Sequence, residues 1–531
     1  MGQVRITGYG GVGEIGGNQL LLEDGDWQAL LDFGTSFGRV ARYFEEFLKP
    51  RAAAGTHDYL RTGLLPPLHG LYRPDLEALM ETSTAWDALR SHAAYRADVR
   101  PVGVLLSHAH VDHCGYLAFL DPRIPVVAGA TTAVTVKALQ DASDDVEREA
   151  VFVKPRQVRV GVLSTDIRRA PAVQRPWRVL AAHGDAVRWT EDAAAYWRRA
   201  MATSAATWER TPAQPLGASL DGHAVRAYAV DHSIQGAMGF AVETSAGWVG
   251  YTGDLRRHGA LGDRTAAFAE ALRRLDVVLL ICEGTQAARA RGPSEEDVRA
   301  NVVATVGTAD GLVVGDFGPR NVERLETFLA AAQAAGRQLV VLAKDALLLH
   351  AIHATAPSVP LPDATAGPLV FRDRRRKADS WERYVRELYG AALVDAESIA
   401  RAPQEFVLAL SLYDLPRLLD VAPRGGRYIY SSSEPHQEEQ IGDMRRLQNW
   451  VELFGMTRFG GEGGAGEDLQ FHASGHAPGP DLLDFIATVQ PRRLLPVHLD
   501  AGGLRFYQEH LRGAGIEIVE PVYGRPVTIR A

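Results

Sequence analysis

Short apolar runs bounded by glycine or polar residues recur through the first half of the chain and again near its end. Runs of this length are typical of buried β-strands, because helices need longer periodic segments. The expected strands cover residues 4–7, 19–23, 27–31, 102–106, 124–128, 228–230, 248–250, 277–282 and 494–498. Several of them end in histidine, aspartate or glutamate, so we expect the chemistry of this protein at strand ends.

From about residue 290 the pattern changes to alternating strands and helices. Ser294 and Asp297 form an S-x-x-D capping pattern, which predicts the start of a helix. Strands are expected over 311–315, 338–343, 368–371, 405–410 and 427–431, and helices over 319–335, 345–354 and 377–390. Repeated β–α units predict a parallel sheet covered by helices, which forms a distinct domain.

The length of 531 residues suggests two or three domains of α/β (α+β) class. We expect one domain over 1–290, the parallel-sheet domain over 291–432, and a return to the first domain over 433–531. Aromatic and proline-rich segments at about 38–100 predict a helical insertion that flanks the active-site cleft. Residues 156–222 contain strand and helix fragments whose order the pattern does not give.

The composition, with 46% hydrophobic and 23% charged residues, is that of an ordinary soluble globular protein. Two cysteines cannot form a disulfide framework, which favours a reducing compartment. The sequence shows no signal peptide and no apolar run near the ~20 residues of a membrane span. We therefore expect a cytoplasmic protein without a membrane partner. Its net charge of −8 requires any basic surface for a polyanion to be local.

Four residues with metal-ligand side chains follow the strand at 102–106 in an HxHxDH pattern: His108, His110, Asp112 and His113. Imidazole and carboxylate are ligands that Zn²⁺ prefers, and the spacing lets the four side chains serve two neighbouring ions. Burying these polar groups together needs compensation, which a pair of metal ions supplies. The alternative is a solvated polar loop, which this spacing behind an apolar strand disfavours.

Further potential ligands end other strands of the expected sandwich. A single histidine or aspartate at a strand end is usually structural, but strand ends of a β-sandwich gather at one rim. The recurrence therefore predicts that these side chains meet, with Asp254 as the natural carboxylate between two ions. The residues concerned are Asp32, His232, Asp254, Glu283 and His498, and His476 precedes a helix in the same part of the chain.

Two weaker patterns suggest anion binding. Gly8, Gly10 and Gly13 spell GxGxxG, but a strand pattern follows where a dinucleotide site needs a helix. We expect these glycines to make tight turns near the metals instead. Arg320 and Asn321 lie where a strand meets a helix N-terminus, a place that favours phosphate. An ordinary β–α turn explains that junction equally well.

Taken in order, these residues resemble the β-CASP nucleases of the metallo-β-lactamase superfamily, and among them ribonuclease J. The resemblance spans nearly the whole chain and includes the opening 10–16. It rests on Asp32, the HxHxDH cluster, His232, Asp254, Glu283, His476 and His498. It implies a metallo-β-lactamase αββα sandwich with an inserted β-CASP domain. The chain departs from the family pattern at two places, and neither departure removes a ligand. The proline that usually follows the isoleucine is missing after Ile234, and Leu499-Asp500 follows His498 where the family has Gly-Glu.

The resemblance also implies roles for individual residues. It implies two Zn²⁺ ions per chain, with Mn²⁺ as the alternative metal. One ion would be held by His108, His110, His232 and Asp254, and the other by Asp112, His113, Asp254 and His498. Asp32 and Glu283 would orient ligand histidines, and His476 would contact the scissile phosphate or assist the leaving oxygen. Substrate contacts are expected from Arg320, Asn321, Ser474, Gly475 and His476.

The expected function is a zinc-dependent ribonuclease that hydrolyses single-stranded RNA with a metal-bridging hydroxide and leaves a 5′-phosphate. The mode, 5′-exonuclease or endonuclease, stays open, and so does the oligomeric state, a homodimer included. The sequence ends at residue 531, soon after His498, so we expect the C-terminal dimerisation domain of bacterial ribonuclease J to be absent.

Three alternatives remain. A DNA nuclease of the same fold is disfavoured by His498, because the DNA repair branch tends to carry valine there. A small-molecule hydrolase would not need the domain between Glu283 and His476. An inactive RNA-binding scaffold would have lost ligands, whereas every ligand position is filled here.

Overall fold

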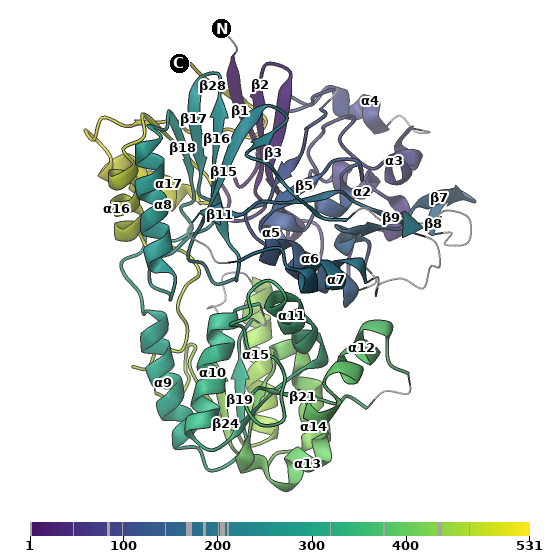
Figure 1. Ribbon diagram of the computed structural model, residues 1–531, viewed down its shortest axis with the longest axis vertical. Coiled ribbons are helices and arrows are strands. Elements are labelled where there is room, and N and C mark those ends of the chain that lie inside the picture. Colours follow the sequence, from purple (N-terminus) through teal and green to yellow (C-terminus); the bar gives the residue numbers. More distant parts are fainter. Residues whose placement is uncertain are drawn as a thin grey trace.

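The computed structural model describes residues 3–45, 47–81, 85–97, 99–143, 145–165, 172–183, 187–199, 201, 208–209, 212–318, 320–374, 377–432, 438–466 and 468–530. Two lobes lie one above the other (Figure 1), and the chain enters and leaves through the upper lobe. Pro319, expected to start a helix, and residue 433, expected to start the return to the first domain, lie outside the described residues. No helix within those ranges is long and apolar enough to cross a membrane.

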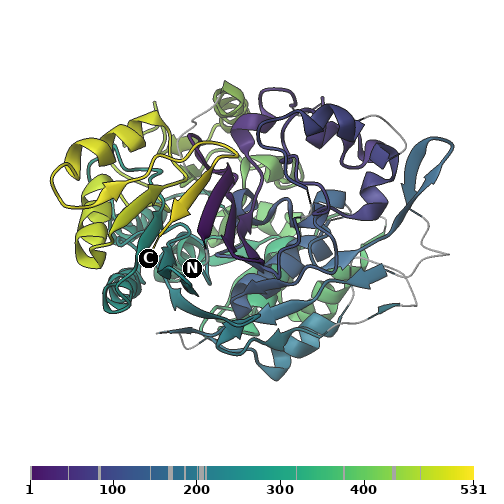
Figure 2. The ribbon, with the colours of Figure 1, turned by 90° about the horizontal axis from the view of Figure 1, so that it is seen from above.

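The upper lobe contains a sandwich of two sheets. The first has the order β13-β10-β5-β4-β3-β2-β1-β28. Its strands are β1 (Val4–Gly10), β2 (Gln19–Asp24), β3 (Trp27–Phe33), β4 (Val104–Leu105), β5 (Val126–Ala128), β10 (Trp177–Val179), β13 (Gln214–Pro215) and β28 (Pro526–Ile529). The pairing of β1 with β28 places the two ends of the chain side by side, as Figures 1 and 2 show.

The second sheet has the order β11-β15-β16-β17-β18-β26-β27, with β14 paired to β15. Its strands are β11 (Ala182–His183), β14 (Ser219–Leu220), β15 (His223–Ala229), β16 (Met238–Thr244), β17 (Gly247–Tyr251), β18 (Leu279–Cys282), β26 (Arg493–Pro496) and β27 (Glu517–Ile518). Leu20 and Leu22 pack against Phe240 and Val249 between the sheets. Leu21 points the other way, because side chains alternate along a strand.

Helices cover both outer faces of the sandwich, which gives the αββα arrangement expected from the sequence. On one side lie α5 (Val111–Cys114), α6 (Ala130–Asp141) and α7 (Glu191–Arg198) with the insertion helices α1 (Phe37–Val40), α2 (His57–Arg61), α3 (Pro74–Glu81) and α4 (Ala85–Arg90). On the other lie α8 (Gly262–Arg274), α16 (Gly479–Val489) and α17 (Ala501–His510). Short 3-10 turns occur at η1 (Ala52–Ala54), η2 (Leu117–Phe119) and η3 (Val146–Arg148).

The segment that the sequence left unordered forms small sheets beside the insertion. β9 (Ala172–Gln174) pairs with β6 (Phe152–Val153) and β12 (Trp208–Glu209), and β7 (Arg156–Arg159) forms a hairpin with β8 (Val162–Thr165). The HxHxDH segment continues into α5, which begins at Val111, directly after His110. Asp112 and His113 therefore lie on a helical turn rather than in a loop.

The lower lobe is built on one fully parallel sheet with the order β22-β21-β20-β23-β19-β24-β25. Its strands are β19 (Val313–Asp316), β20 (Gln338–Val341), β21 (Leu369–Phe371), β22 (Leu393–Val394), β23 (Phe406–Ala409), β24 (Arg427–Tyr430) and β25 (Thr457–Phe459). Because β25 pairs with β24, the sheet continues past residue 432, and we propose that this domain extends to Phe459.

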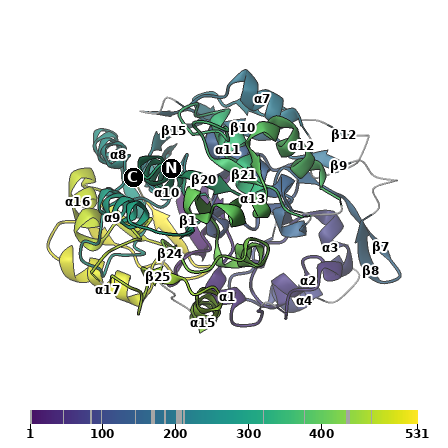
Figure 3. The ribbon, with the colours of Figure 1, turned by 90° about the horizontal axis from the view of Figure 1, so that it is seen from below.

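Helices cover both faces of the parallel sheet (Figure 3). α9 (Glu295–Gly307), α10 (Val322–Ala334), α11 (Ala343–His353) and α12 (Ser380–Leu388) contribute to one apolar core. α13 (Ala396–Arg401), α14 (Leu418–Val421) and α15 (Glu438–Leu453) contribute to the other, beside the turns η4 (Gly390–Ala392), η5 (Pro403–Glu405) and η6 (Leu412–Arg417). The two-layer covering agrees with the prediction of repeated β–α units.

A single buried arginine ties the segment after the HxHxDH helix to the first sheet. Arg175 is fully buried and donates five hydrogen bonds to main-chain carbonyl oxygens. The acceptors, at 2.7–3.1 Å, are those of Leu117, Leu120, Asp121, Ile124 and Ala150. The guanidinium therefore satisfies the carbonyls of a turn-rich segment that has few strand partners.

Replacing this arginine should destabilise the fold strongly. Arg175→Met leaves buried carbonyl oxygens without donors, so we expect the free energy of unfolding to fall by about 3 kcal/mol or more. The matched control is Arg123→Met, because Arg123 lies on the same segment with 85% of its side chain exposed. Thermal unfolding of both variants tests this; equal shifts in Tm would contradict it.

Asp345, in the first turn of α11, links the stability of the lower lobe to pH. Burial raises the pKa of this carboxyl to about 7, whereas an unfolded aspartate titrates near 4. Between these values the folded state binds more protons, so its stability falls as pH rises and levels off above pH 7. Asp345→Asn lacks that contribution. The Tm of the variant minus the Tm of the wild type should therefore increase from pH 4 to pH 7. Parallel Tm profiles would contradict this.

Candidate metal centre

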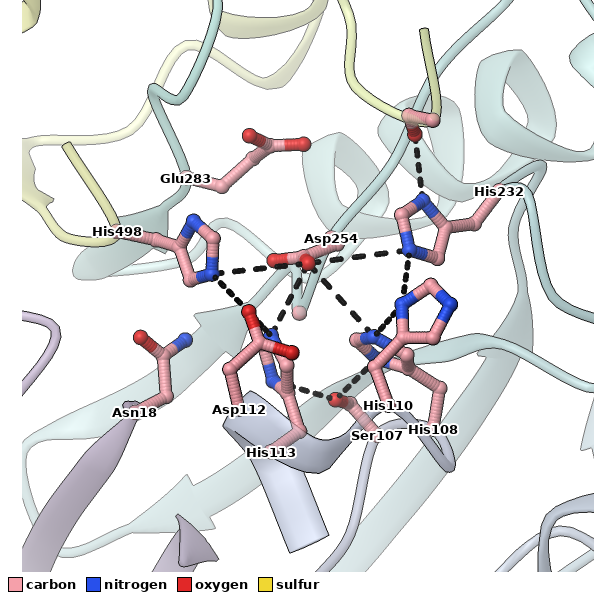
Figure 4. A network of polar contacts seen from close by, with 12 residues as sticks. Asn18, Ser107, His108, His110, Asp112, His113, His232, Asp254, Glu283 and His498 are labelled. Carbon is pink, nitrogen blue, oxygen red and sulfur yellow. Dashed lines mark hydrogen bonds and ion pairs between the residues drawn. The ribbon is translucent and has the colours of Figure 1, made fainter. Parts of the chain in front are cut away.

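The carboxyl ends of strands from both sheets meet at the edge of the sandwich that faces the lower lobe. Asp32 ends β3, and the HxHxDH segment follows the neighbouring β4. In the second sheet, β17, β18 and β26 are parallel neighbours. They lead into Asp254, Glu283 and His498. Because parallel strands end at one edge, these segments converge, and Figure 4 shows the HxHxDH residues beside Asp254, Glu283 and His498.

The converging side chains form two ligand groups that share one aspartate. The ligand atoms within each group lie within 4.8 Å of one another. One group is His108, His110, His232 and Asp254, and the other is Asp112, His113, Asp254 and His498. These are the two sets that the sequence resemblance implied, now adjacent in space. A third group joins Asp254 and His498 to Glu283 and His476.

Asp254 is the centre of this cluster. Its Oδ2 lies 3.0 Å from His113 Nε2, 3.6 Å from His108 Nε2 and 3.8 Å from the Nε2 atoms of His232 and His498. The side chain is 1% exposed. A carboxylate so enclosed by imidazoles can serve two ions at once.

Ring nitrogens face one another in a way that metal ions would explain. His110 Nδ1 lies 3.1 Å from His108 Nε2 and 3.0 Å from His232 Nε2. Burial and neighbouring histidines hold the pKa of His108 and His232 well below the usual value, so both rings are neutral, the form that binds metal. In addition, Asp254 Oδ1 is buried without a hydrogen-bond partner among the described residues. The donor set therefore fits zinc.

Each outer nitrogen of three histidines contacts a group that fixes the ring. His113 Nδ1 lies 2.7 Å from Asp32 Oδ2, and His232 Nδ1 lies 2.5 Å from the carbonyl oxygen of Gly475. His498 Nδ1 lies 2.6 Å from Thr285 Oγ1, which donates to the carbonyl of His498. Since these partners accept, the proton stays on Nδ1 and the Nε2 lone pair points into the cluster.

Asp32 is itself held rigidly. It is fully buried, and its carboxylate accepts hydrogen bonds from the Ser107 amide (2.7 Å), the Ser107 hydroxyl (2.7 Å) and the Tyr251 hydroxyl (2.6 Å). Its backbone φ of 57° is in the left-handed region, which turns the chain at the strand end. Asp32 thus fixes both the ring of His113 and the start of the HxHxDH segment.

Glu283 and His476 form a separate pair at the edge of the cluster. Both carboxylate oxygens of Glu283 lie 3.1 Å from His476 Nδ1. The carboxylate is also held by the amides of Leu255 (2.9 Å) and Thr285 (3.1 Å). Burial alone would lower the pKa of His476, but Glu283 and Asp254 raise it to about 9. Glu283 therefore contacts His476 and not one of the histidines in the two ligand groups.

The expected substrate contacts differ in their surroundings. Arg320 Nη1 donates to the carbonyl of Ala109, inside the HxHxDH segment, at 3.2 Å. Ser474 Oγ accepts from the His476 amide at 3.1 Å, and a side chain at Gly475 would meet Ser233. Asn321, by contrast, caps α10 by accepting from the Arg324 amide at 3.0 Å. The structure brings all but the Asn321 side chain into contact with the site.

The glycine pattern at the N-terminus also contributes to the site. Gly8 and Gly10 lie in β1, Gly13 lies in the loop to β2, and a strand follows, as expected. The loop approaches the cluster closely: Gly11 O accepts from the His498 amide at 2.7 Å. Gly16, at φ 81°, would place a Cβ 3.1 Å from Asp112 Oδ2.

Comparison with known proteins agrees with this architecture. The description "Zn-dependent metallo-hydrolase RNA specificity domain" belongs to the family model that matches residues 469–521. Ribonuclease J of Mycobacterium tuberculosis (strain ATCC 25618 / H37Rv) is 23% identical over 518 residues, 94% of this chain and 69% of that protein. Ribonuclease J of Sinorhizobium meliloti is 26% identical over 304 residues, which cover 56% of this chain and 49% of that protein.

A solved structure supports the fold. The crystal structure of a protein of unknown function from Enterococcus faecalis V583 matches with a TM-score of 0.65 at 20% identity, over 99% of this chain and 100% of that chain. Fold, donor set and matched domain are those of a metal-dependent hydrolase, and they resemble the β-CASP nucleases of the metallo-β-lactamase superfamily. Within that class the chain resembles ribonuclease J.

The supports of the ligand histidines should matter for metal affinity. We expect Asp32→Ala and Thr285→Val to weaken zinc binding by about 10- to 100-fold, because each frees one ring to rotate. Thr244→Val is the matched control, since Thr244 Oγ1 donates to Gly247 O at the opposite end of the sheet. Calorimetric titration of the metal-free proteins with Zn²⁺ gives the affinities; unchanged binding in both variants would refute the assigned support.

Proposed function

We propose that this protein is a ribonuclease that binds two Zn²⁺ ions and hydrolyses phosphodiester bonds of single-stranded RNA. The observation that supports this most is the pair of four-residue ligand groups joined by Asp254. RNA is favoured over DNA because the matched family model is described as an RNA specificity domain. Mn²⁺ remains the alternative metal.

One ion would be held by His108, His110, His232 and Asp254, and the other by Asp112, His113, Asp254 and His498. Two such ions would supply an activated water for attack on phosphorus and would offset charge that develops on the phosphoryl oxygens. Around them, Asp32, Thr285 and the Gly475 carbonyl keep the Nε2 lone pairs directed inward. This preorganisation is the contribution of the chain to the reaction.

His476 is the residue we assign to the phosphate. Its Nδ1 is bound to Glu283, which keeps the ring protonated and oriented. The ring can then donate a proton to a phosphoryl oxygen or to the departing oxygen. Arg320 adds a cation from the lower lobe beside the HxHxDH segment. The β-CASP domain would close over this region and admit a single strand.

Compartment and cleavage mode complete the proposal. Both cysteines are unpaired and buried, which fits the reducing cytoplasm. We propose cleavage that leaves a 5′-phosphate on the product, by 5′-exonuclease action, endonuclease action or both, in RNA processing or decay. A homodimer stays a prediction that the molar mass in solution will test.

Digestion of a 3′-labelled single-stranded RNA with a 5′-monophosphate, beside the matching DNA, tests this function. We expect RNA cleavage, reduced about 100-fold or more in Asp112→Ala and His113→Ala, the scale of losing a charge-stabilising group. Asp420→Ala, on the exposed surface of the lower lobe, should cleave normally. Loss of full-length RNA without internal fragments would indicate exonuclease action.

The same assay can refute the proposal. Activity on neither polymer, with zinc bound, would exclude a nuclease and favour a small-molecule hydrolase. Cleavage of DNA alone would replace RNA by DNA as the substrate. Cleavage that persists in both aspartate and histidine variants would show that these residues do not hold the catalytic metals.

A further inference from the structure

Two fully buried arginines, one from each lobe, meet on a single glutamate. Arg256 lies in the loop after β17 of the sandwich, and Arg324 lies in α10 of the parallel-sheet domain. Both are 0% exposed, and Glu295, the first residue of α9, is 4% exposed. Glu295 Oε1 accepts from Arg256 Nη1 at 2.8 Å, and Oε2 accepts from Arg324 Nη2 at 2.8 Å. The glutamate thus binds the two lobes together.

Arg256 Nη2 donates to Glu323 Oε2 of α10 at 2.8 Å, and two further contacts of Arg256 reach both segments that enclose His232. Its Nε donates to Asp231 Oδ1 at 3.2 Å, one residue before this histidine. Its Nη1 also donates to the carbonyl of Ser474 at 3.1 Å. Ser474 precedes Gly475, whose carbonyl accepts from His232 Nδ1. Arg256 therefore holds His232 from the side of its own chain and from the side of its hydrogen-bond partner.

Arg324 holds the same returning segment from the other lobe. Its Nη1 donates to the carbonyl oxygens of Ser431 (2.7 Å) and Phe471 (3.0 Å). Phe471 stands three residues before Ser474, so the two arginines fix the segment 471–474 at both ends. The segment continues into His476, which we assign to the phosphate.

Energetics argue that this cluster does more than stabilise the fold. Removing charged groups from water costs several kcal/mol per ion, and replacing buried ion pairs by apolar residues is often neutral or stabilising. Such a cluster is better explained by the one arrangement it enforces than by net stability. Here the enforced arrangement includes the position of the parallel-sheet domain, His232 and the segment up to His476.

We propose that Glu295 is a positioning residue: through Arg256 and Arg324 it makes the geometry of His232 and of segment 474–476 depend on the seating of the parallel-sheet domain. The position of the parallel-sheet domain and the geometry of the metal centre are then coupled. The kinetic consequence rests on the function proposed above. The effect on the metal site does not.

The test compares Glu295→Gln with Glu149→Gln. Glu149 is the matched control because it is also buried and also joins two arginines, Arg73 and Arg156, but within the insertion side of the sandwich. Each zinc-loaded variant is assayed for kcat and KM on single-stranded RNA and for Tm. Each is then loaded with Co²⁺, whose visible absorption reports the arrangement of the histidine ligands.

We expect Glu295→Gln to lower kcat about tenfold, to leave KM within about twofold, and to change the Co²⁺ spectrum. Glu149→Gln should lower Tm by a similar amount and leave kcat and the spectrum as in the wild type. Arg324 donates to Glu295 Oε2 from both Nε and Nη2. Arg324→Lys keeps the charge but loses this paired hydrogen bond, so it should shift the same readouts in the same direction. It serves as the second variant if Glu295→Gln fails to fold.

The outcomes separate the two proposals. A normal kcat and spectrum in Glu295→Gln, or in Arg324→Lys if that is the folded variant, would overturn the positioning role. Equal losses of kcat in Glu295→Gln and Glu149→Gln would overturn it too, because the effect would then be general destabilisation. Wild-type protein without RNA cleavage, combined with a Co²⁺ spectrum changed only by Glu295→Gln, would refute the ribonuclease and keep the positioning role.

Discussion

The structure depends on one crowded carboxylate. Asp254 lies within 3.0–3.8 Å of four imidazole nitrogens, almost without exposure to solvent. So many polar groups cannot be buried together unless something offsets their lost hydration. Bound cations would offset it, and the walls of the site suit them: outer nitrogens are bound to acceptors, and inner lone pairs are directed to common points. The ends of both sheets, the glycine loop at the N-terminus and the returning segment before α16 all lie where they do because they complete this enclosure.

The enclosure uses two kinds of support. Asp32 and Thr285 belong to the sandwich and hold the rings of His113 and His498 through short hydrogen bonds, and Ser107 and Tyr251 hold the Asp32 carboxylate in turn. Ser474 and Gly475 follow the inserted domain in the sequence, and their carbonyls are fixed by His232, Arg256 and His258. The first support is rigid because it is part of a sheet. The second is only as rigid as the contact between the lobes. A metal centre built this way can respond to the domain that covers its substrate.

Strand-end histidines and aspartates could be predicted from sequence because apolar runs locate the strands and parallel strands share an edge. The αββα sandwich and the parallel sheet were confirmed for the same reason. Thr285 and Ser107 were missed since a hydroxyl at a strand end has no distinctive pattern. Arg256 was missed for a different reason: within Leu255-Arg256-Arg257-His258 it reads as an exposed basic run, and only tertiary packing shows that it is buried. Asn321 was expected to contact phosphate, but its side chain caps a helix.

The order of the chain has a consequence for synthesis. Among the residues labelled in Figure 4, the first of the two ligand groups' residues along the chain is His108. The last, His498, follows β26 and lies after the whole inserted domain. The first strand also cannot complete its pairing until the last strand has been made, because β1 pairs with β28. A chain still being translated therefore has most of its donors but neither a closed sandwich nor a complete second ligand group. The second ligand group therefore becomes complete only after the chain has been synthesised past His498, and the pairing of β1 only after β28.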